Sequence, residues 1–227
     1  MEIKALATAG RETRRGMAID HQEALSSSSP ASSSFHPSAV RHFYVAVDRL
    51  LFKMDTLVDL LGVTGRRPFL PVVLCCNSRD ELDAVYSAVS NLTFISSFPL
   101  YSDQSETERA SVLENFRQST IRWNQNANAH PDDGVDPDNQ KSCMIVVTDA
   151  CLPFITLGEA PLAARVLINY ELPSKKETYL RRISTCLAAD GIVINMVVGG
   201  EVVILKGLEE NSGLIVAEMP INISEIL

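Results

Sequence analysis

The chain has 227 residues, of which 46% are hydrophobic and 21% are charged. This ordinary globular composition excludes disorder of the whole chain, because it supplies enough apolar material for a core. The formal net charge of −8 at pH 7 argues against a protein that binds nucleic acid through a basic surface alone. No apolar run approaches the ~20 residues of a membrane span, so we expect no membrane partner.

The five cysteines are odd in number and form no C-x-x-C pair. This pattern predicts reduced thiols in the core of an intracellular protein, and neither a disulfide framework nor a structural zinc site. We therefore predict no metal site. A histidine-based catalytic site is not expected either, because the four histidines lie in the N-terminal segment, at its edge, or in a polar segment near residue 130.

Residues 1–39 differ in composition from the rest of the chain. The stretch Ser26–Ser34 is a low-complexity run that cannot build a core, so we predict a disordered, Ser-rich tail. Three arginines precede this run and raise the alternative of an organelle transit peptide. The same segment contains four acidic residues, Glu2, Glu12, Asp20 and Glu23, which argues against that alternative because transit peptides are poor in acids.

Residues 40–227 form one predicted domain in which strands and helices alternate. In chain order, hydrophobic periodicity predicts strand 43–47, helix 53–61, strand 69–76, helix 82–89 behind an N-cap at Asn77-Ser78, strand 92–98, helix 105–116, strand 142–147, strand 165–170, helix 176–183, strand 191–198 and helix 202–211. The strands are apolar almost throughout, which predicts burial on both faces. We therefore predict an α/β fold, a parallel sheet with helices on both faces.

One segment interrupts this alternation. Residues Trp123–Lys141 are rich in Asn, Asp, Pro and Gly, and they are too many and too polar for an ordinary connection between a helix and a strand. We interpret residues from about 119 to 141 as a polar insert that forms a mobile loop. A functional insert is the alternative.

Ligands of open parallel sheets bind beyond the carboxyl ends of the strands. In this chain those positions are residues 77–79, Thr148-Asp149 and residues 171–173. The tempting acidic run Asp80–Asp83 follows an N-cap, where carboxylates favour the helix dipole, so we do not interpret it as a metal site.

The order of these segments resembles the second, C-terminal RecA-like domain of DEAD-box RNA helicases, in particular the eukaryotic initiation factor 4A group. The likeness covers residues 41–227 except the insert. It is carried by FYV at 43–45 with MDTL at 54–57, LCCNSR at 74–79, helix 105–116 with Arg109, VTD at 147–149, VLINYELP at 166–173, YLRRI at 179–183 and EMPINISEIL at 218–227. The resemblance implies the RecA-like fold of the P-loop NTPase superfamily.

The resemblance also implies where ligands bind. ATP and Mg²⁺ serve active members of the family. Arg79, Thr148 and Asp149 stand where RNA contacts are implied, and Arg181 and Arg182 stand where a vestigial contact to nucleotide phosphate is implied. Simpler alternatives remain open: a solvated helix residue for Arg79, an ordinary turn for Thr148 and Asp149, and a solvated helix face for the arginine pair.

The sequence departs from the family where the chemistry takes place. It contains no G-x-x-x-x-G-K-[ST] phosphate loop, which active members carry in their first RecA domain. Residues Cys151–Thr156 replace Ala-Arg-Gly-Ile-Asp, and RRIST at 181–185 replaces His-Arg-Ile-Gly-Arg. The implied arginine fingers, each of which supplies ~10³–10⁵ in rate, fall at Thr185 and near Cys186–Ala188. We therefore predict no catalytic residue and no cofactor.

Our leading hypothesis is a non-catalytic module that binds protein partners in RNA metabolism or translation. The resemblance implies a helical-repeat scaffold of the translation or exon-junction machinery as a candidate partner. An RNA-binding module is one alternative, which the net charge disfavours. Half of a helicase working with a separate first RecA domain is another, which the missing arginines disfavour. We expect the protein in the cytoplasm or nucleus, with organelle targeting by the tail left open.

Overall fold

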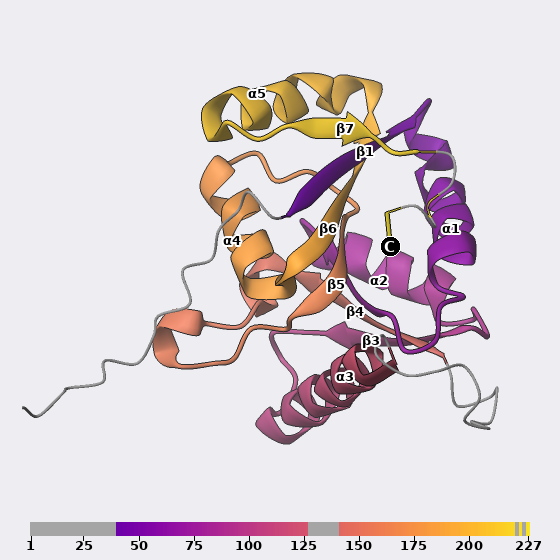
Figure 1. The fold of residues 1–227 in the computed structure, drawn as a ribbon, viewed down its shortest axis with the longest axis vertical. Coiled ribbons are helices and arrows are strands. Elements are labelled where there is room, and N and C mark those ends of the chain that lie inside the picture. Colours follow the sequence, from indigo (N-terminus) through magenta and orange to yellow (C-terminus); the bar gives the residue numbers. More distant parts are fainter. Residues whose placement is uncertain (1–39, 127–140, 221–222, 224–225) are drawn as a thin grey trace, which may run out of the picture. The chain divides into compact units, whose positions relative to one another are not determined.

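The computed structural model describes residues 40–126, 141–220, 223 and 226–227, so the predicted Ser-rich tail and residues 127–140 lie outside the described residues. The strands are β1 (Arg41–Val47), β2 (Pro71–Cys76), β3 (Ile95–Leu100), β4 (Ser142–Thr148), β5 (Ala164–Asn169), β6 (Leu187–Val198) and β7 (Val216–Glu218). They form one sheet in the order β3-β4-β2-β5-β6-β1-β7, and every pairing is parallel (Figure 1).

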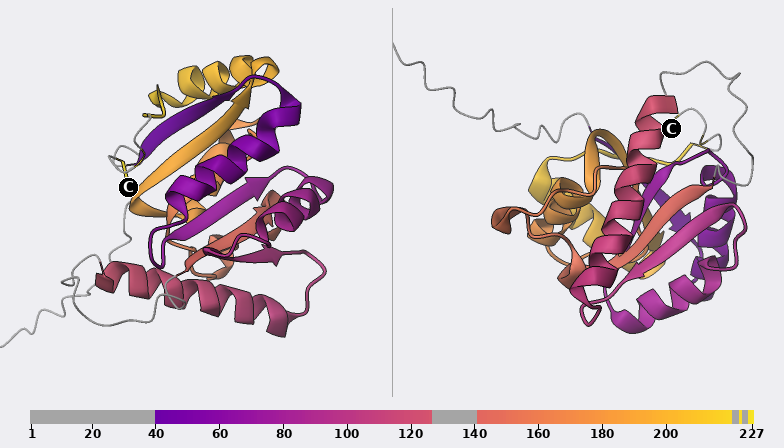
Figure 2. Two further views of the ribbon diagram at one scale, coloured as in Figure 1. Left: turned by 90° about the vertical axis from the view of Figure 1, so that its right-hand side faces the viewer. Right: turned by 90° about the horizontal axis from the view of Figure 1, so that it is seen from below.

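Helices cover both faces of this sheet (Figure 2). The helices α1 (Lys53–Thr64) and α2 (Arg79–Val89) pack on one face, and α3 (Glu106–Asn126), α4 (Lys176–Cys186) and α5 (Val202–Ser212) pack on the other. Short 3₁₀ turns join some elements: η2 (Leu50–Phe52), η4 (Asp149–Cys151), η5 (Ile155–Leu157) and η6 (Gly199–Glu201). The prediction of a parallel sheet between two layers of helices is confirmed.

Continuous burial of the central strands explains this architecture. All six residues of β2 are buried, and their side chains alternate between the two cores. A strand that is apolar at every position has no face for water, so it must lie inside a sheet covered on both sides. At the end of β2 the Ser78 hydroxyl accepts a hydrogen bond from the Glu81 backbone N–H at 3.2 Å, so the predicted N-cap starts α2.

The helix α3 is longer than its apolar pattern predicts. It continues from residue 106 to Asn126, so residues 119–126 of the proposed insert lie in a helix, and the rest of the insert lies outside the described residues. Only Phe116 and Thr120 of α3 are fully buried. The helix shows few apolar positions beyond residue 116 because most of its surface faces water, which is why periodicity misses its second half.

The described helices include no candidate for a membrane-spanning helix. None of the helices within residues 40–126 and 141–220 combines enough length with enough apolar character to cross a bilayer.

Candidate functional site

The carboxyl edge of the sheet brings the predicted ligand positions together. The strands β4, β2 and β5 are neighbours, so the residues that follow them meet at one edge. The Asn77 backbone N–H donates to the Glu171 carboxylate at 2.7 Å, and the Asn77 side-chain amide donates to the Leu172 carbonyl at 3.1 Å. Residues nearly a hundred positions apart in sequence are thus joined by direct hydrogen bonds.

Arg182 lies at the centre of this edge and is completely buried. Its Nε and Nη2 donate to the two Asp149 carboxylate oxygens, each at 2.7 Å. Nη1 donates to Asn169 Oδ1 at 2.9 Å and to the Glu171 carbonyl at 2.8 Å, and Nη2 also donates to Asn77 Oδ1 at 2.7 Å. A guanidinium carries five N–H donors, so every one of them is used.

This arrangement makes Arg182 a clamp between strand ends. The helix α4 supplies the cation, and the ends of β2, β4 and β5 supply the acceptors. A phosphate would have to displace one of these acceptors to reach Arg182. The contact between Arg182 and a nucleotide phosphate therefore stays a prediction, and it would require the clamp to open.

Further buried polar groups extend from the clamp through the sheet. The Asn169 amide donates to Asn195 Oδ1 at 2.8 Å, and the Asn195 amide donates to the Phe43 carbonyl at 3.0 Å and to the Tyr179 hydroxyl oxygen at 3.2 Å. Because Tyr179 accepts from Asn195, its own proton is available to His42 Nδ1, 3.0 Å away. We call the series His42, Tyr179, Asn195, Asn169 and Arg182 the core polar chain.

His42 ends the core polar chain with an unsatisfied group. If Nδ1 accepts from Tyr179, the neutral ring carries its proton on Nε2, which is buried and has no hydrogen-bond partner among the described residues. Burial disfavours the charged ring and lowers the pKa of His42 from 6.5 to about 4. Sequence reasoning did not predict the core polar chain. Two asparagines inside apolar strands were a usable signal for it, because buried amides require hydrogen-bond partners.

Arg79 behaves differently from Arg182. It lies at the start of α2, its side chain is 56% exposed, and its Nη1 donates to Asp103 at 2.9 Å. The guanidinium also lies 4.8 Å from the ring centroid of Tyr101. Hydrogen bonding to Arg79 lowers the pKa of Asp103. The structure thus places Arg79 as an accessible cation, and its RNA contact stays a prediction.

The segment after β4 differs most from the family motif. The Thr148 hydroxyl donates to Cys151 Sγ at 3.5 Å, while Asp149 is the partner of Arg182. The guanidinium of Arg181 lies 5.3 Å from the Phe154 ring centroid. Arg181 therefore contacts this segment through the Phe154 ring, whereas Arg182 forms the clamp. RNA contacts of Thr148 and Asp149 stay predictions, and so does a phosphate contact of Arg181.

A second arginine holds the same segment from the other side. Arg109 in α3 donates to the Cys151 carbonyl at 3.0 Å and approaches the Glu159 carboxylate at 3.4 Å. That carboxylate also accepts from the Phe154 backbone N–H at 2.8 Å. These contacts fix the replaced motif as a structured turn packed between α3 and α4.

The positions implied for arginine fingers lie inside the core. The helix α4 ends at Cys186 and β6 begins at Leu187, so no loop separates them. Thr185, Cys186 and Leu187 are all buried, and the Thr185 carbonyl accepts from the Leu162 backbone N–H at 2.9 Å. Burial raises the pKa of the Cys186 thiol, as expected for a thiol without access to water.

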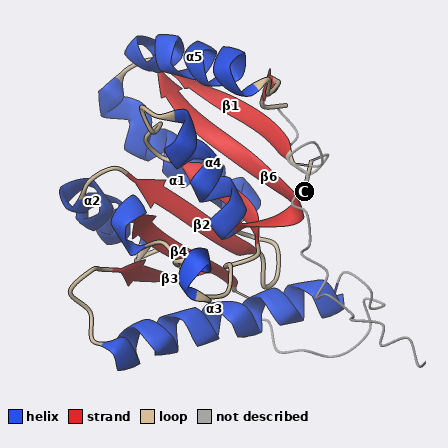
Figure 3. Ribbon diagram, turned by 90° about the vertical axis from the view of Figure 1, so that its left-hand side faces the viewer, coloured by secondary structure: helices blue, strands red, loops and turns tan. Residues whose placement is uncertain are grey.

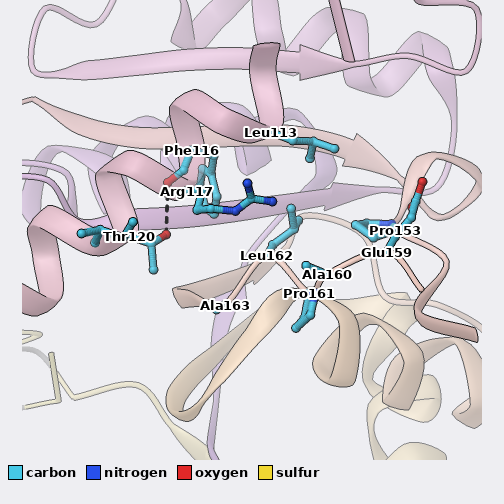
Figure 4. Close-up of a pocket in the computed structure, with 11 residues that line it drawn as sticks. Leu113, Phe116, Arg117, Thr120, Pro153, Glu159, Ala160, Pro161, Leu162 and Ala163 are labelled. Atoms are coloured by element: carbon cyan, nitrogen blue, oxygen red, sulfur yellow. Dashed lines mark hydrogen bonds between the residues drawn. The ribbon is translucent and has the colours of Figure 1, made fainter. Parts of the chain in front are cut away.

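A cavity of about 280 Å³ lies apart from this edge, between α3 and residues 153–163 (Figure 4). Its walls are mostly apolar and include Leu113, Phe116, Pro153 and Leu162. None of the predicted site residues lines it, so the geometry does not connect it with the predicted ligand edge.

Comparison with known proteins agrees with the fold. No protein-family model matches the chain. It is 27% identical over 190 residues to eukaryotic initiation factor 4A of Cryptosporidium parvum, and 25% identical over 190 residues to the ATP-dependent RNA helicase fal1 of Schizosaccharomyces pombe. These matches cover 83% of the chain but only 40% and 41% of the relatives, so the chain spans about two fifths of their length.

Solved structures give the same class of domain. The C-terminal domain of the DEAD-box protein Dbp5 matches with a TM-score of 0.60 and 17% identity, over 82% of this chain and 92% of that one. The Escherichia coli DEAD-box protein SrmB, bound to the regulator of ribonuclease activity A, matches with a TM-score of 0.55 and 18% identity, over 80% of this chain and 91% of that one. The described domain therefore has the fold of a DEAD-box C-terminal domain. Over 83% of its length the chain is similar in sequence to RNA helicases of the initiation factor 4A and Fal1 type.

Proposed function

We propose that the chain is a non-catalytic relative of DEAD-box helicases, which works by binding protein partners in RNA metabolism or translation, in the cytoplasm or nucleus. The observation that carries this proposal is the state of Arg182. It is the arginine retained from the His-Arg-Ile-Gly-Arg motif, and it is buried with all its donors bound to groups of the chain itself.

The positions of the arginine fingers support the same proposal. Such a finger must reach the transferring phosphoryl group with a cation, and its loss costs ~10³–10⁵ in rate. Here the corresponding residues are Thr185 and Cys186–Ala188, of which the first three are buried in the core beside β6. These side chains carry no positive charge that could act as an arginine finger.

Protein binding is supported by what related folds do. The solved relatives include the C-terminal domain of Saccharomyces cerevisiae Dbp5 bound to Gle1 and the DEAD-box protein SrmB bound to the regulator of ribonuclease activity A. Those partners belong to those proteins. For this chain we propose a protein partner of the same general kind, with a helical-repeat scaffold of the translation or exon-junction machinery as the specific candidate.

RNA binding is the second candidate function, and the exposed guanidinium of Arg79 favours it. Saccharomyces cerevisiae Dbp5 has been solved with RNA and a nucleotide. The net charge of −8 weakens this candidate, because contacts to RNA phosphates depend on positive charge.

Complementation in trans tests the lack of catalysis. The full chain is mixed with the isolated first RecA domain of the Cryptosporidium initiation factor 4A, RNA, ATP and Mg²⁺, and phosphate release is measured. We expect no increase over the first domain alone, because no arginine stands at the finger positions. The matched control supplies that factor's own C-terminal domain in place of the chain. RNA-stimulated hydrolysis with this chain, at a rate near the control, would contradict the proposal and support half of a helicase.

A further inference from the structure

Among the described residues, one edge of the sheet is paired along only half of its outer strand, β1. The strand β1 pairs with β6 along its whole length through Val47, but β7 pairs only with residues 42–44 of β1. The Tyr44 carbonyl accepts from the Met219 backbone N–H at 3.0 Å on the β7 side. Main-chain groups two residues apart in a strand point to the same side. The N–H and C=O of Ala46 therefore point to the β7 side, like those of Tyr44, but lie beyond the last residue of β7 that pairs with β1. Ala46 is exposed, and no strand of the described residues pairs with it on that side.

A cavity of about 680 Å³ opens beside this uncovered edge. It lies between α5 and the sheet, and α5 lies beside the edge of the sheet that β1 and β7 form (Figure 1), as Figure 3 also shows for β1. Its apolar lining comes from β1, β6, α5 and β7 and consists of Tyr44, Ala46, Val47, Val197, Val202, Leu205 and Val216. We call the cavity and the free edge of β1 together the β1 groove. It places pockets for side chains next to the main-chain groups of Ala46, which pair with no strand among residues 40–126 and 141–220 on the β7 side.

Charge defines the groove further. Its lining carries two carboxylates, Asp48 and Glu209, and one ammonium group, Lys206. The side chain of Asp48 is 81% exposed, and its nearby cation, Arg49, is itself 71% exposed. Glu209 already accepts a hydrogen bond from the Val216 backbone N–H at 3.0 Å. The lining is therefore net negative, as is the whole chain, and Asp48 is the more exposed of its two carboxylates.

We propose that the β1 groove binds an extended peptide segment of a partner protein, with apolar side chains at alternate positions and a lysine or arginine facing Asp48. A free strand edge selects an extended chain, because only an extended chain continues the ladder of main-chain hydrogen bonds. Alternate side chains of such a peptide point to one face and enter the cavity. This inference rests on the proposed protein-binding function and names its site.

A random peptide library displayed on phage and selected on the immobilised full chain tests the groove, with fluorescence anisotropy of the selected peptides as the readout. Two substitutions block the groove by different means. Gly199 lines the cavity, and a Cβ atom built on it would have no other atom within 4 Å. We therefore expect Gly199→Phe to fill the groove without a clash at the backbone. Ala46→Pro removes one edge N–H, which an edge strand tolerates. Gly62→Phe is the matched control, because Gly62 is equally open but lies on α1, over the other face.

We expect the selected peptides to alternate apolar residues around a Lys or Arg, and to bind both groove variants at least tenfold more weakly than the wild type and the Gly62 variant. Asp48→Lys should weaken them as well. Slower hydrogen exchange of the Ala46 amide in the wild type, on addition of peptide, supports the same contact without any substitution.

Other outcomes would contradict the proposal that the β1 groove binds an extended peptide. Peptides that bind the Gly199→Phe and Ala46→Pro variants as tightly as the wild type use another surface. Recovery of no binding peptide, or of helical ones only, contradicts an extended ligand. A wild-type dimer that Ala46→Pro converts to a monomer would make a second copy the occupant. None of these results affects the measurement of phosphate release with a separate first RecA domain. A wrong assignment of the binding site is therefore distinguishable from a wrong assignment of the function.

Discussion

Replacement of Arg182 by methionine is expected to lower the free energy of unfolding by about 3–5 kcal/mol, which is the usual cost of removing one partner of a buried ion pair. The substitution leaves Asp149 without its cation, and it removes the donors that satisfy the Asn77 and Asn169 side chains and the Glu171 carbonyl. Small domains are stable by only about 5–15 kcal/mol, so this change takes a large part of the total.

Urea unfolding followed by circular dichroism measures this effect. Arg79→Met is the matched control, because it removes an arginine whose ion pair is exposed on both sides, and we expect a change within about 0.5 kcal/mol. The double variant Arg182→Met, Asp149→Asn should cost less than the sum of the single variants, because Asp149 interacts directly with Arg182. A loss below about 1 kcal/mol for Arg182→Met would contradict the clamp.

Acid is expected to destabilise the domain through His42. The pKa of His42 is about 4 in the folded chain against 6.5 ordinarily, because burial disfavours the charged ring. Between these two values the unfolded chain binds a proton that the folded chain does not. Stability therefore falls as pH falls from about 6.5 to 4, by roughly 3 kcal/mol from this group alone, and the loss from it stops below about pH 4.

Unfolding curves of the wild type and of His42→Asn between pH 7 and pH 4 isolate this contribution. Asparagine keeps an acceptor near Tyr179 but does not titrate in this range. The wild type should lose roughly 3 kcal/mol more than the variant over the window. Parallel losses in the two proteins would show that His42 is protonated in the folded state, against the arrangement of the core polar chain.

Much of the fold could be predicted from the sequence, because its central strands are apolar at every position. The short apolar run that forms β2, followed by an N-cap, favours a strand buried on both faces. Prediction failed where this signal is weak. The strand β7 has three residues, two of them exposed, and was missed. The strand β3 begins three residues later than expected, at Ile95, because its interior is only partly buried and its pattern is diffuse.

The site was predictable only as a location. The rule that ligands bind at carboxyl ends of strands placed Asn77 and Asp149 at one edge, as the structure shows. The clamp itself was not predictable, because Arg182 gathers acceptors from segments up to 105 positions away. Sequence spacing holds no information about such contacts. The resemblance implies a phosphate contact for Arg182, which stays a prediction, and the structure shows the guanidinium bonded to the chain's own acceptors.

Affinity capture of the tagged full-length protein from its own cells, with and without RNase, tests the proposed function most directly. We expect the main partner to survive RNase, because Arg182 at the carboxyl edge is bonded to the chain's own groups, whereas no described strand pairs with β1 beyond residue 44 on its β7 side. The variant Arg79→Ala should retain that partner. Partners that all disappear after RNase, or with Arg79→Ala, would mean that the domain acts through RNA and would contradict the account.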